Sequence, residues 1–151
     1  MATFIIPVNP GLSYLNEIFK NGNTLLWIHK RGYPKYQEGD ILYMYISSSV
    51  KEIYFKARVN RTNVQANLEE LSERSTWIKE EDLEEQVRNN NNDEIELIRK
   101  VPENLRSQLS IDALSSNGFM KNFPFGKPVN ISDNERLIHY IESVIEEKNS
   151  I

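Results

Sequence analysis

The stretch DILYMYISSSVKEIYFKARV, residues 40–59, decides the fold. Its first part, Ile41–Ile46, is β-branched and aromatic, and its second part, Ile53–Val59, alternates apolar side chains with tyrosine, lysine and arginine. Such alternation is typical of a strand that buries one face, and the three serines between the two parts are suited to a turn. The stretch therefore predicts a central antiparallel hairpin, with Ile53 and Phe55 on the buried face of its second strand.

Segments on either side of this hairpin predict the remaining elements. Thr3–Val8 and Glu94–Val101 are expected to be strands, and Leu25–Ile28 is a further apolar stretch. Helices are expected through Leu15, Ile18 and Phe19, over residues 67–90, and over Pro102–Leu114 with an end near Asn117-Gly118.

The last helix has the clearest pattern. Ser132 and Glu135 have the spacing of a capping box, in which the serine and the glutamate each accept from a backbone amide of the first turn. Apolar side chains then recur on one face, at Leu137, Ile138, Ile141, Val144 and Ile145. Because strands and helices do not alternate strictly, we expect an α+β domain with a small curved mixed sheet or open β-barrel and peripheral helices.

Composition narrows the class of protein. The 151 residues fit a single domain, residues 1–151, and 39% of them are hydrophobic. No apolar run approaches the roughly 18 residues that cross a bilayer, and the N-terminus lacks the pattern of a signal peptide. The chain contains no cysteine, which excludes disulfides, thiolate metal sites and a cysteine nucleophile. We expect a cytoplasmic protein without membrane contact.

Charge is distributed unevenly around a net value of −4. Residues 19–61 contain eight lysines and arginines against three acidic residues, whereas residues 62–103 contain five against twelve. A basic segment suits a polyanionic partner. The same clustering also fits an ordinary solvated surface.

The inventory of reactive side chains argues against an enzyme. There are two histidines, and no phosphate-binding glycine loop or nucleophile elbow is present. Asp93, Glu94 and Glu96 with Lys100 match no defensible metal-dependent nuclease pattern. We expect no catalytic residues, no metal and no cofactor, and a small nuclease or hydrolase is the least favoured alternative.

Aromatic side chains are the better candidates for recognition. A flat ring can stack on any nucleic-acid base, a contact worth roughly 1–3 kcal/mol. The serine turn beside Tyr45 supplies hydroxyls of the kind that read a base edge. Aromatic residues are also common in strands, so each one taken singly fits a core position as well.

Four segments in order resemble the EVE domain of the PUA-like superfamily, most closely the version that precedes HNH nucleases in modification-dependent restriction proteins. They are Phe4–Pro10, Leu26-Trp27, Gly39–Ser47 and Ile53–Val59. The resemblance covers about the first 60 residues well and the Gly118–Ile141 stretch more loosely. It implies a pocket for a base flipped out of nucleic acid, commonly a modified cytosine in DNA, as the related YTH domains hold methylated adenine in RNA.

The resemblance also implies roles for individual residues. Asn9 would end the first strand, Trp27 would form a pocket wall, and Tyr45 with Ser47 would face the ligand. The pocket set is completed by Ser48 and Tyr54. The basic segment adds candidate phosphate contacts at Lys30, Arg31, Lys35, Lys56, Arg58 and Arg61.

The expected partner is therefore DNA or RNA that carries a modified base, with a separately encoded nuclease as a second candidate partner. The sequence departs from the family in having no nuclease segment, which leaves binding without cleavage. Its acidic middle region, residues 62–101, also opposes a long nucleic-acid track. The alternative is a protein-interaction or regulatory scaffold on the same fold, in which the aromatic residues are core.

Overall fold

The computed structural model describes residues 1–8, 16, 20, 24–28, 32–46, 51–65, 92–119 and 126–147. Its strands are β1 (Thr3–Val8), β2 (Thr24–Ile28), β3 (Ile41–Ile46), β4 (Glu52–Val64), β5 (Asn92–Lys100) and β6 (Val129–Asn130). The 3-10 helix η1 (Glu103–Leu109) and the helices α4 (Ile111–Ser116) and α5 (Glu135–Glu147) follow β5 or β6. None of the helices in these ranges is long and apolar enough to cross a membrane. The helices expected through Leu15, Ile18 and Phe19 and over residues 67–90 lie outside the described residues.

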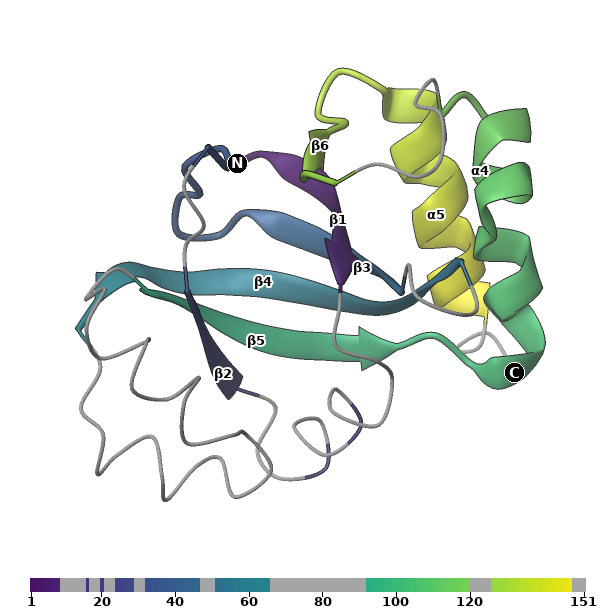
Figure 1. The fold of residues 1–151 in the computed structure, drawn as a ribbon. Helices are drawn as coiled ribbons and strands as arrows, with labels where there is room; N and C mark the ends of the chain where they lie inside the picture. Colours follow the sequence, from purple (N-terminus) through teal and green to yellow (C-terminus); the bar gives the residue numbers. More distant parts are fainter. Residues whose placement is uncertain are drawn as a thin grey trace.

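The strands form one mixed sheet in the order β2-β5-β4-β3-β1-β6 (Figure 1). β1 runs parallel to β3, and the other neighbouring pairs are antiparallel. The predicted hairpin, β3 with β4, lies in the middle of this order. The sheet is not closed into a barrel, so the expected α+β class with a curved open sheet is confirmed.

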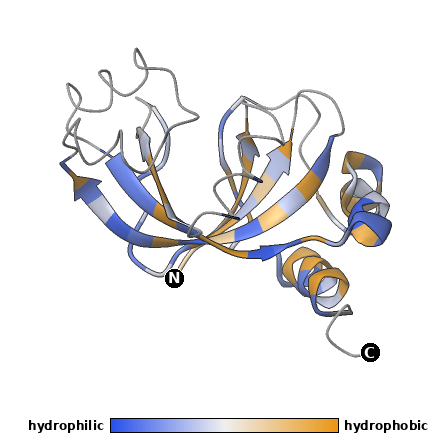
Figure 2. Cartoon of the chain, turned by 90° about the horizontal axis from the view of Figure 1, so that it is seen from below, coloured by the Kyte–Doolittle hydropathy of each residue, from blue (hydrophilic) through white to orange (hydrophobic). Residues whose placement is uncertain are grey.

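The bend of the sheet creates two unlike faces. Figure 2 shows α4 and α5 outside the bend, so we call the helix-covered side the outer face and the concave side the inner face. The inner face carries a buried cluster of Phe4, Ile6, Val8, Leu25, Tyr36, Leu42, Met44, Ile46, Tyr54, Phe55, Ala57, Val59, Ile95 and Leu97. The outer-face cluster joins Ile5, Tyr43, Tyr45 and Ile53 to side chains from η1, α4 and α5.

A bulge in β4 sets which side chains reach which face. Met44 pairs with Phe55, but the next residue, Tyr45, pairs with Ile53, which leaves Tyr54 as an extra residue. Ile53 therefore packs on the outer face, while Tyr54 and Phe55 both pack on the inner face. The prediction that Ile53 shares a face with Phe55 is wrong, because the extra residue reverses the alternation at this point.

The segment after β5 is broken into two helices where one was predicted. Ser110 lies between η1 and α4 with extended backbone (φ −71°, ψ 163°), and its Oγ accepts from the amide of Ala113 at 3.3 Å. It also forms a β-bridge with Glu52. An extended residue that is engaged in this way cannot continue a helix.

The predicted end of this segment at Gly118 is confirmed. Gly118 has φ +104°, the left-handed region that suits glycine. The amide of Phe119 donates to the carbonyl of Leu114 at 2.9 Å, and the amide of Gly118 donates to the carbonyl of Ser115 at 3.3 Å. These two bonds and the buried Phe119–Leu114 pair form a Schellman motif.

The cap of α5 differs from the predicted capping box. The helix begins at Glu135, and the Oδ1 of Asn134 accepts from the amide of Leu137 at 3.2 Å. Ser132 instead accepts from the amide of Thr3 at 3.0 Å, which joins the start of β1 to the segment before the helix. The capping-box prediction is wrong because this tertiary contact engages the serine.

The apolar stripe of α5 packs as predicted, with Leu137, Ile141 and Val144 buried against the sheet. A polar contact joins the same surfaces. The buried hydroxyl of Tyr43 donates to Glu142 Oε2 at 2.6 Å, and Lys56 Nζ donates to Glu142 Oε1 at 2.6 Å. One carboxylate of α5 thus satisfies polar groups from β3 and β4. Burial and the bond to Glu142 both raise the pKa of Tyr43.

We predict that Asn134→Ala lowers the free energy of unfolding by about 1 kcal/mol, because the first turn of α5 loses its cap. Its Nδ2 also donates to the carbonyl of Gly118 at 2.9 Å. Glu135→Ala should change stability by less than about 0.5 kcal/mol, since Glu135 is an exposed residue of the first turn. Urea unfolding of both variants tests the assignment, and a larger loss for Glu135→Ala would restore the capping box.

We also predict that Glu142→Ala destabilises the protein by about 1–3 kcal/mol, because the Tyr43 hydroxyl and the Lys56 ammonium lose their shared acceptor. Glu146→Ala is the matched control, since its carboxylate lies on the same helix but meets Arg99 only at 3.6 Å in an exposed pair. That change should be nearly neutral. An equal loss of stability in Glu142→Ala and Glu146→Ala, measured by thermal unfolding, would contradict the special role of Glu142.

Candidate ligand site on the inner face

The structure separates the two aromatic residues expected to face a ligand together. Trp27 is partly buried and packs against the inner-face cluster. Tyr45 is wholly enclosed in the outer-face cluster, and burial raises its pKa to about 12. The expectation that Trp27 and Tyr45 line one pocket is therefore corrected, because the sheet lies between them. Asn9, Ser47 and Ser48 lie outside the described residues, so their roles stay predictions.

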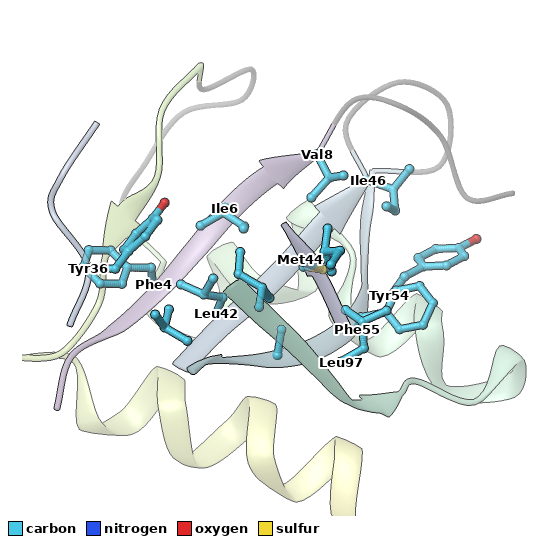
Figure 3. Close-up of a cluster of buried hydrophobic side chains, with 14 residues drawn as sticks. Phe4, Ile6, Val8, Tyr36, Leu42, Met44, Ile46, Tyr54, Phe55 and Leu97 are labelled. Carbon is cyan, nitrogen blue, oxygen red and sulfur yellow. The ribbon is translucent and has the colours of Figure 1, made fainter. Parts of the chain in front are cut away.

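Tyr54 lies on the inner face but far from the end that holds Tyr36. Figure 3 places the Tyr54 ring at one end of the inner-face cluster and Tyr36 at the other. The Arg106 guanidinium sits over the Tyr54 ring, with its central carbon 4.0 Å from the ring centroid. Tyr54 is buried, and its ring contacts the guanidinium of Arg106.

Three of the predicted phosphate contacts point to the outer face. Lys56 and Arg58 alternate with Phe55, Ala57 and Val59, which all face inward. Each of the three is paired with a carboxylate: Lys56 with Glu142, Arg58 with Glu96, and Arg61 with Glu94. These cations are thus neutralised locally and cannot act beside Trp27. Lys35 is exposed just before Tyr36, whereas Lys30 and Arg31 lie outside the described residues.

The inner face carries a carboxylate next to Trp27. Trp27 of β2 and Asp93 of β5 are paired in register, which places their side chains on one face of the sheet. Asp93 is followed at alternate positions by Ile95 and Leu97, both in the inner-face cluster. Asp93 is buried beside these apolar side chains, with only 3% of the residue exposed. Burial of a carboxylate is expensive unless hydrogen bonds or charges compensate it.

Tyr36 is held beside this carboxylate by a structured loop. Asp40 Oδ1 accepts from the amide of Ala2 and Oδ2 from the amide of Gln37, both at 2.8 Å, which closes the loop against β1. The Tyr36 ring packs edge-on to Phe4, with ring centroids 5.3 Å apart. Burial raises the pKa of the Tyr36 hydroxyl, and the negative charge of Asp93 raises it further.

Trp27, Tyr36 and Asp93 form the candidate site. It combines a half-buried indole, a phenol that stays protonated and a carboxylate that accepts hydrogen bonds. Such a set suits a flat ligand with hydrogen-bond donors at its edge. Within the described ranges, no three histidine, aspartate or glutamate side chains lie close enough to hold a metal ion.

The acidic residues weighed for a nuclease do not converge. Asp93 faces inward, whereas Glu94 and Glu96 face outward and pair with Arg61 and Arg58. Neighbouring residues of a strand point to opposite faces, so the sheet separates these carboxylates. Asp93 is thereby separated from Glu94 and Glu96, and each of these two glutamates is engaged by an arginine.

Sequence reasoning missed two members of the candidate site. Asp93 had a usable signal, because it occupies the same alternation phase as Ile95 and Leu97 and so falls on the buried face of its strand. Tyr36 had none, since it lies in a loop with no periodic pattern. Trp27 was identified from its residue type.

Comparison with known proteins adds information about the fold. No protein-family model matches the sequence, and no curated protein matches it.

Solved structures do match. An ASCH protein from Zymomonas mobilis superposes with a TM-score of 0.61 at 13% identity, covering 94% of each chain. A protein from Pseudomonas putida gives 0.60 at 12% identity, covering 95% of this chain and 99% of that one. A protein from Agrobacterium tumefaciens gives 0.56 at 11% identity, covering 94% and 92%. ASCH domains belong to the PUA-like superfamily, as EVE domains do, and the matches do not single out EVE. The chain therefore has a fold similar to that of the ASCH structure, an open mixed sheet with few helices in the described residues.

Proposed function

We propose that this chain is a nucleic-acid-binding module that holds a flipped, modified base against Trp27 and Tyr36 and does not cleave the strand. The observation that carries the proposal is the buried carboxylate of Asp93 beside a half-buried indole. The PUA-like fold and the resemblance of the first 60 residues to EVE domains support the same class of ligand.

The indole is the part of the site that a ligand meets first, because Trp27 is the more exposed member of the set. Stacking of a base on an aromatic ring contributes roughly 1–3 kcal/mol and needs no particular base. Trp27 therefore supplies affinity, and discrimination has to come from polar groups.

Asp93 supplies that discrimination. An ionised carboxylate only accepts hydrogen bonds and has about four lone-pair sites, so it can take a further donor from a ligand. Cytosine offers its N4 amino group as such a donor, whereas thymine presents a carbonyl oxygen at that position. We therefore propose an amino-bearing base, cytosine or a modified cytosine, as the ligand.

The proton on Tyr36 fits this assignment. Because burial and Asp93 raise its pKa, the phenol remains a donor throughout the physiological range. The Tyr36 hydroxyl as donor and the Asp93 carboxylate as acceptor match the carbonyl and amino groups on the edge of cytosine. In thymine the Asp93 carboxylate would meet a carbonyl oxygen, which leaves two buried acceptors facing each other.

A second candidate is a protein-interaction scaffold. The enclosure of Tyr45 and Tyr54 favours it, since these two aromatic residues are packed rather than offered to a ligand. In that case Trp27 would be part of the packing, and truncation would lower stability without a loss of any nucleic-acid affinity.

We predict that Trp27→Ala weakens binding to a cytosine-containing single-stranded oligonucleotide by about 5- to 150-fold, the equivalent of one stacking contact. Tyr140→Ala is the matched control, because Tyr140 is a half-buried aromatic residue of α5 on the outer face. Fluorescence anisotropy with labelled oligonucleotides gives the affinities, and thermal unfolding of the same samples reports stability. Loss of stability in Trp27→Ala, with no oligonucleotide bound by the parent protein, would favour the scaffold.

Asp93→Asn provides the specificity test. The amide can both donate and accept, so the preference for cytosine over thymine should shrink by about tenfold, the effect of one charge-assisted hydrogen bond. Oligonucleotides with cytosine, 5-methylcytosine or thymine at one position measure this preference. An unchanged preference would contradict the role of Asp93, and cleavage of any of these strands by the parent protein would contradict binding without cleavage.

A further inference from the structure

A pair of cations occupies the end of the inner face opposite Trp27. Arg106 of η1 stacks over Tyr54, and its Nε donates to the carbonyl of Val101 at 3.1 Å. Stacking and this hydrogen bond hold the guanidinium in one place. Lys100 is the last residue of β5 and pairs across the sheet with Phe55.

The pairing of Lys100 determines the direction of its side chain. Opposite residues of neighbouring strands lie on one face, and Phe55 is in the inner-face cluster. The preceding residue, Arg99, pairs instead with Lys56 and reaches Glu146 on α5, so it belongs to the outer face. The adjacent residues Arg99 and Lys100 thus place one cation on the outer face and one on the inner face of the sheet.

Among the described residues, the two inward cations differ from the cations of the strands' outer face in having no ion pair. Within the described part of the chain, salt bridges engage Lys56, Arg58, Arg61 and Arg99. Neither Lys100 nor Arg106 forms a salt bridge with another described residue. Burial and the positive charge of Arg106 lower the pKa of Lys100, against a weaker attraction from Glu103. Two cations that raise each other's energy in this way are stabilised by an anion between them.

We infer that Lys100 and Arg106 bind a phosphate group. A guanidinium recognises phosphate through its planar set of donors, and an ammonium adds a point charge. The donors of Arg106 other than Nε remain available for this contact.

The position of this pair, taken with the proposed function on which this step rests, defines the span of the nucleic-acid contact. Lys100 lies seven residues beyond Asp93 on β5, about 23 Å at the rise of a strand. A stacked single strand advances roughly 3.4 Å per nucleotide, so about seven nucleotides separate the two contacts. The floor between them is buried, so we infer two separate contacts: a base at Trp27 and a backbone phosphate at Lys100 and Arg106.

The test compares Lys100→Gln with Arg99→Gln, which removes the same charge from the adjacent residue on the opposite face. For a single-stranded oligonucleotide of about ten nucleotides, Lys100→Gln should weaken binding by about tenfold. It should also reduce the salt slope, log K against log salt, by about 0.7. Arg99→Gln should leave both unchanged. An oligonucleotide of about three nucleotides cannot reach both contacts, so Lys100→Gln should not affect its binding.

Inorganic phosphate supplies a probe that does not depend on the base. Titration of the parent protein should shift the NMR signals of the Lys100 side chain, and not those of Arg99. If phosphate shifts the NMR signals of Lys100 while no oligonucleotide binds, the phosphate site is supported and the proposed base-binding function is wrong. If Lys100→Gln behaves like Arg99→Gln with both probes while Trp27→Ala still weakens oligonucleotide binding, the phosphate site is wrong and the proposed function stands.

Discussion

The extra residue in β4 is the constraint on which the rest of the structure depends. Without it, Ile53 would face inward with Phe55, and the outer face would lose an apolar side chain where the helices pack. The bulge instead puts Tyr45 and Ile53 under the helices and Tyr54 with Phe55 on the inner face. Because a bulge increases local twist and bends a strand, it also favours the curvature that makes the inner face concave. One inserted residue thereby gives both faces a core.

Electrostatics follows the same division into faces. On the outer face each strand cation described above meets a carboxylate, and Glu142 binds two groups at once. On the inner face, charged groups lie at the two ends of an apolar floor: Asp93 at one end, Lys100 and Arg106 at the other. Opposite charges at separate ends do not neutralise each other across this distance in water. This separation of charge along one face complements a ligand that has hydrogen-bond donors at one point and an anionic group at another, as the proposed nucleic acid does.

The sequence predicted the parts of the fold that rest on a repeating pattern. The hairpin and the stripe of α5 were predictable because burial of one face imposes a period on the side chains. The bulge was not, since Tyr54 and Phe55 are both apolar enough to face a core and local sequence does not choose between them. The cap of α5 was misassigned because Ser132 and Asn134 are both good cap residues, and a contact with Thr3 decides between them. Of the candidate site, only Trp27 could be identified from its residue type. The positions of Asp93 and Tyr36 beside it depend on strand register and on a loop closed by Asp40.

The bond between Ser132 and Thr3 joins residues 129 positions apart, and Glu142 meets Tyr43 across 99 positions. During synthesis the chain emerges from its N-terminus, so β1, β3 and β4 exist long before α5 does. Until that helix is made, η1 and α4 are the described helices that can cover the outer face, and the contribution of Leu137, Ile141 and Val144 is missing. Folding should therefore be limited by contacts that close very long loops.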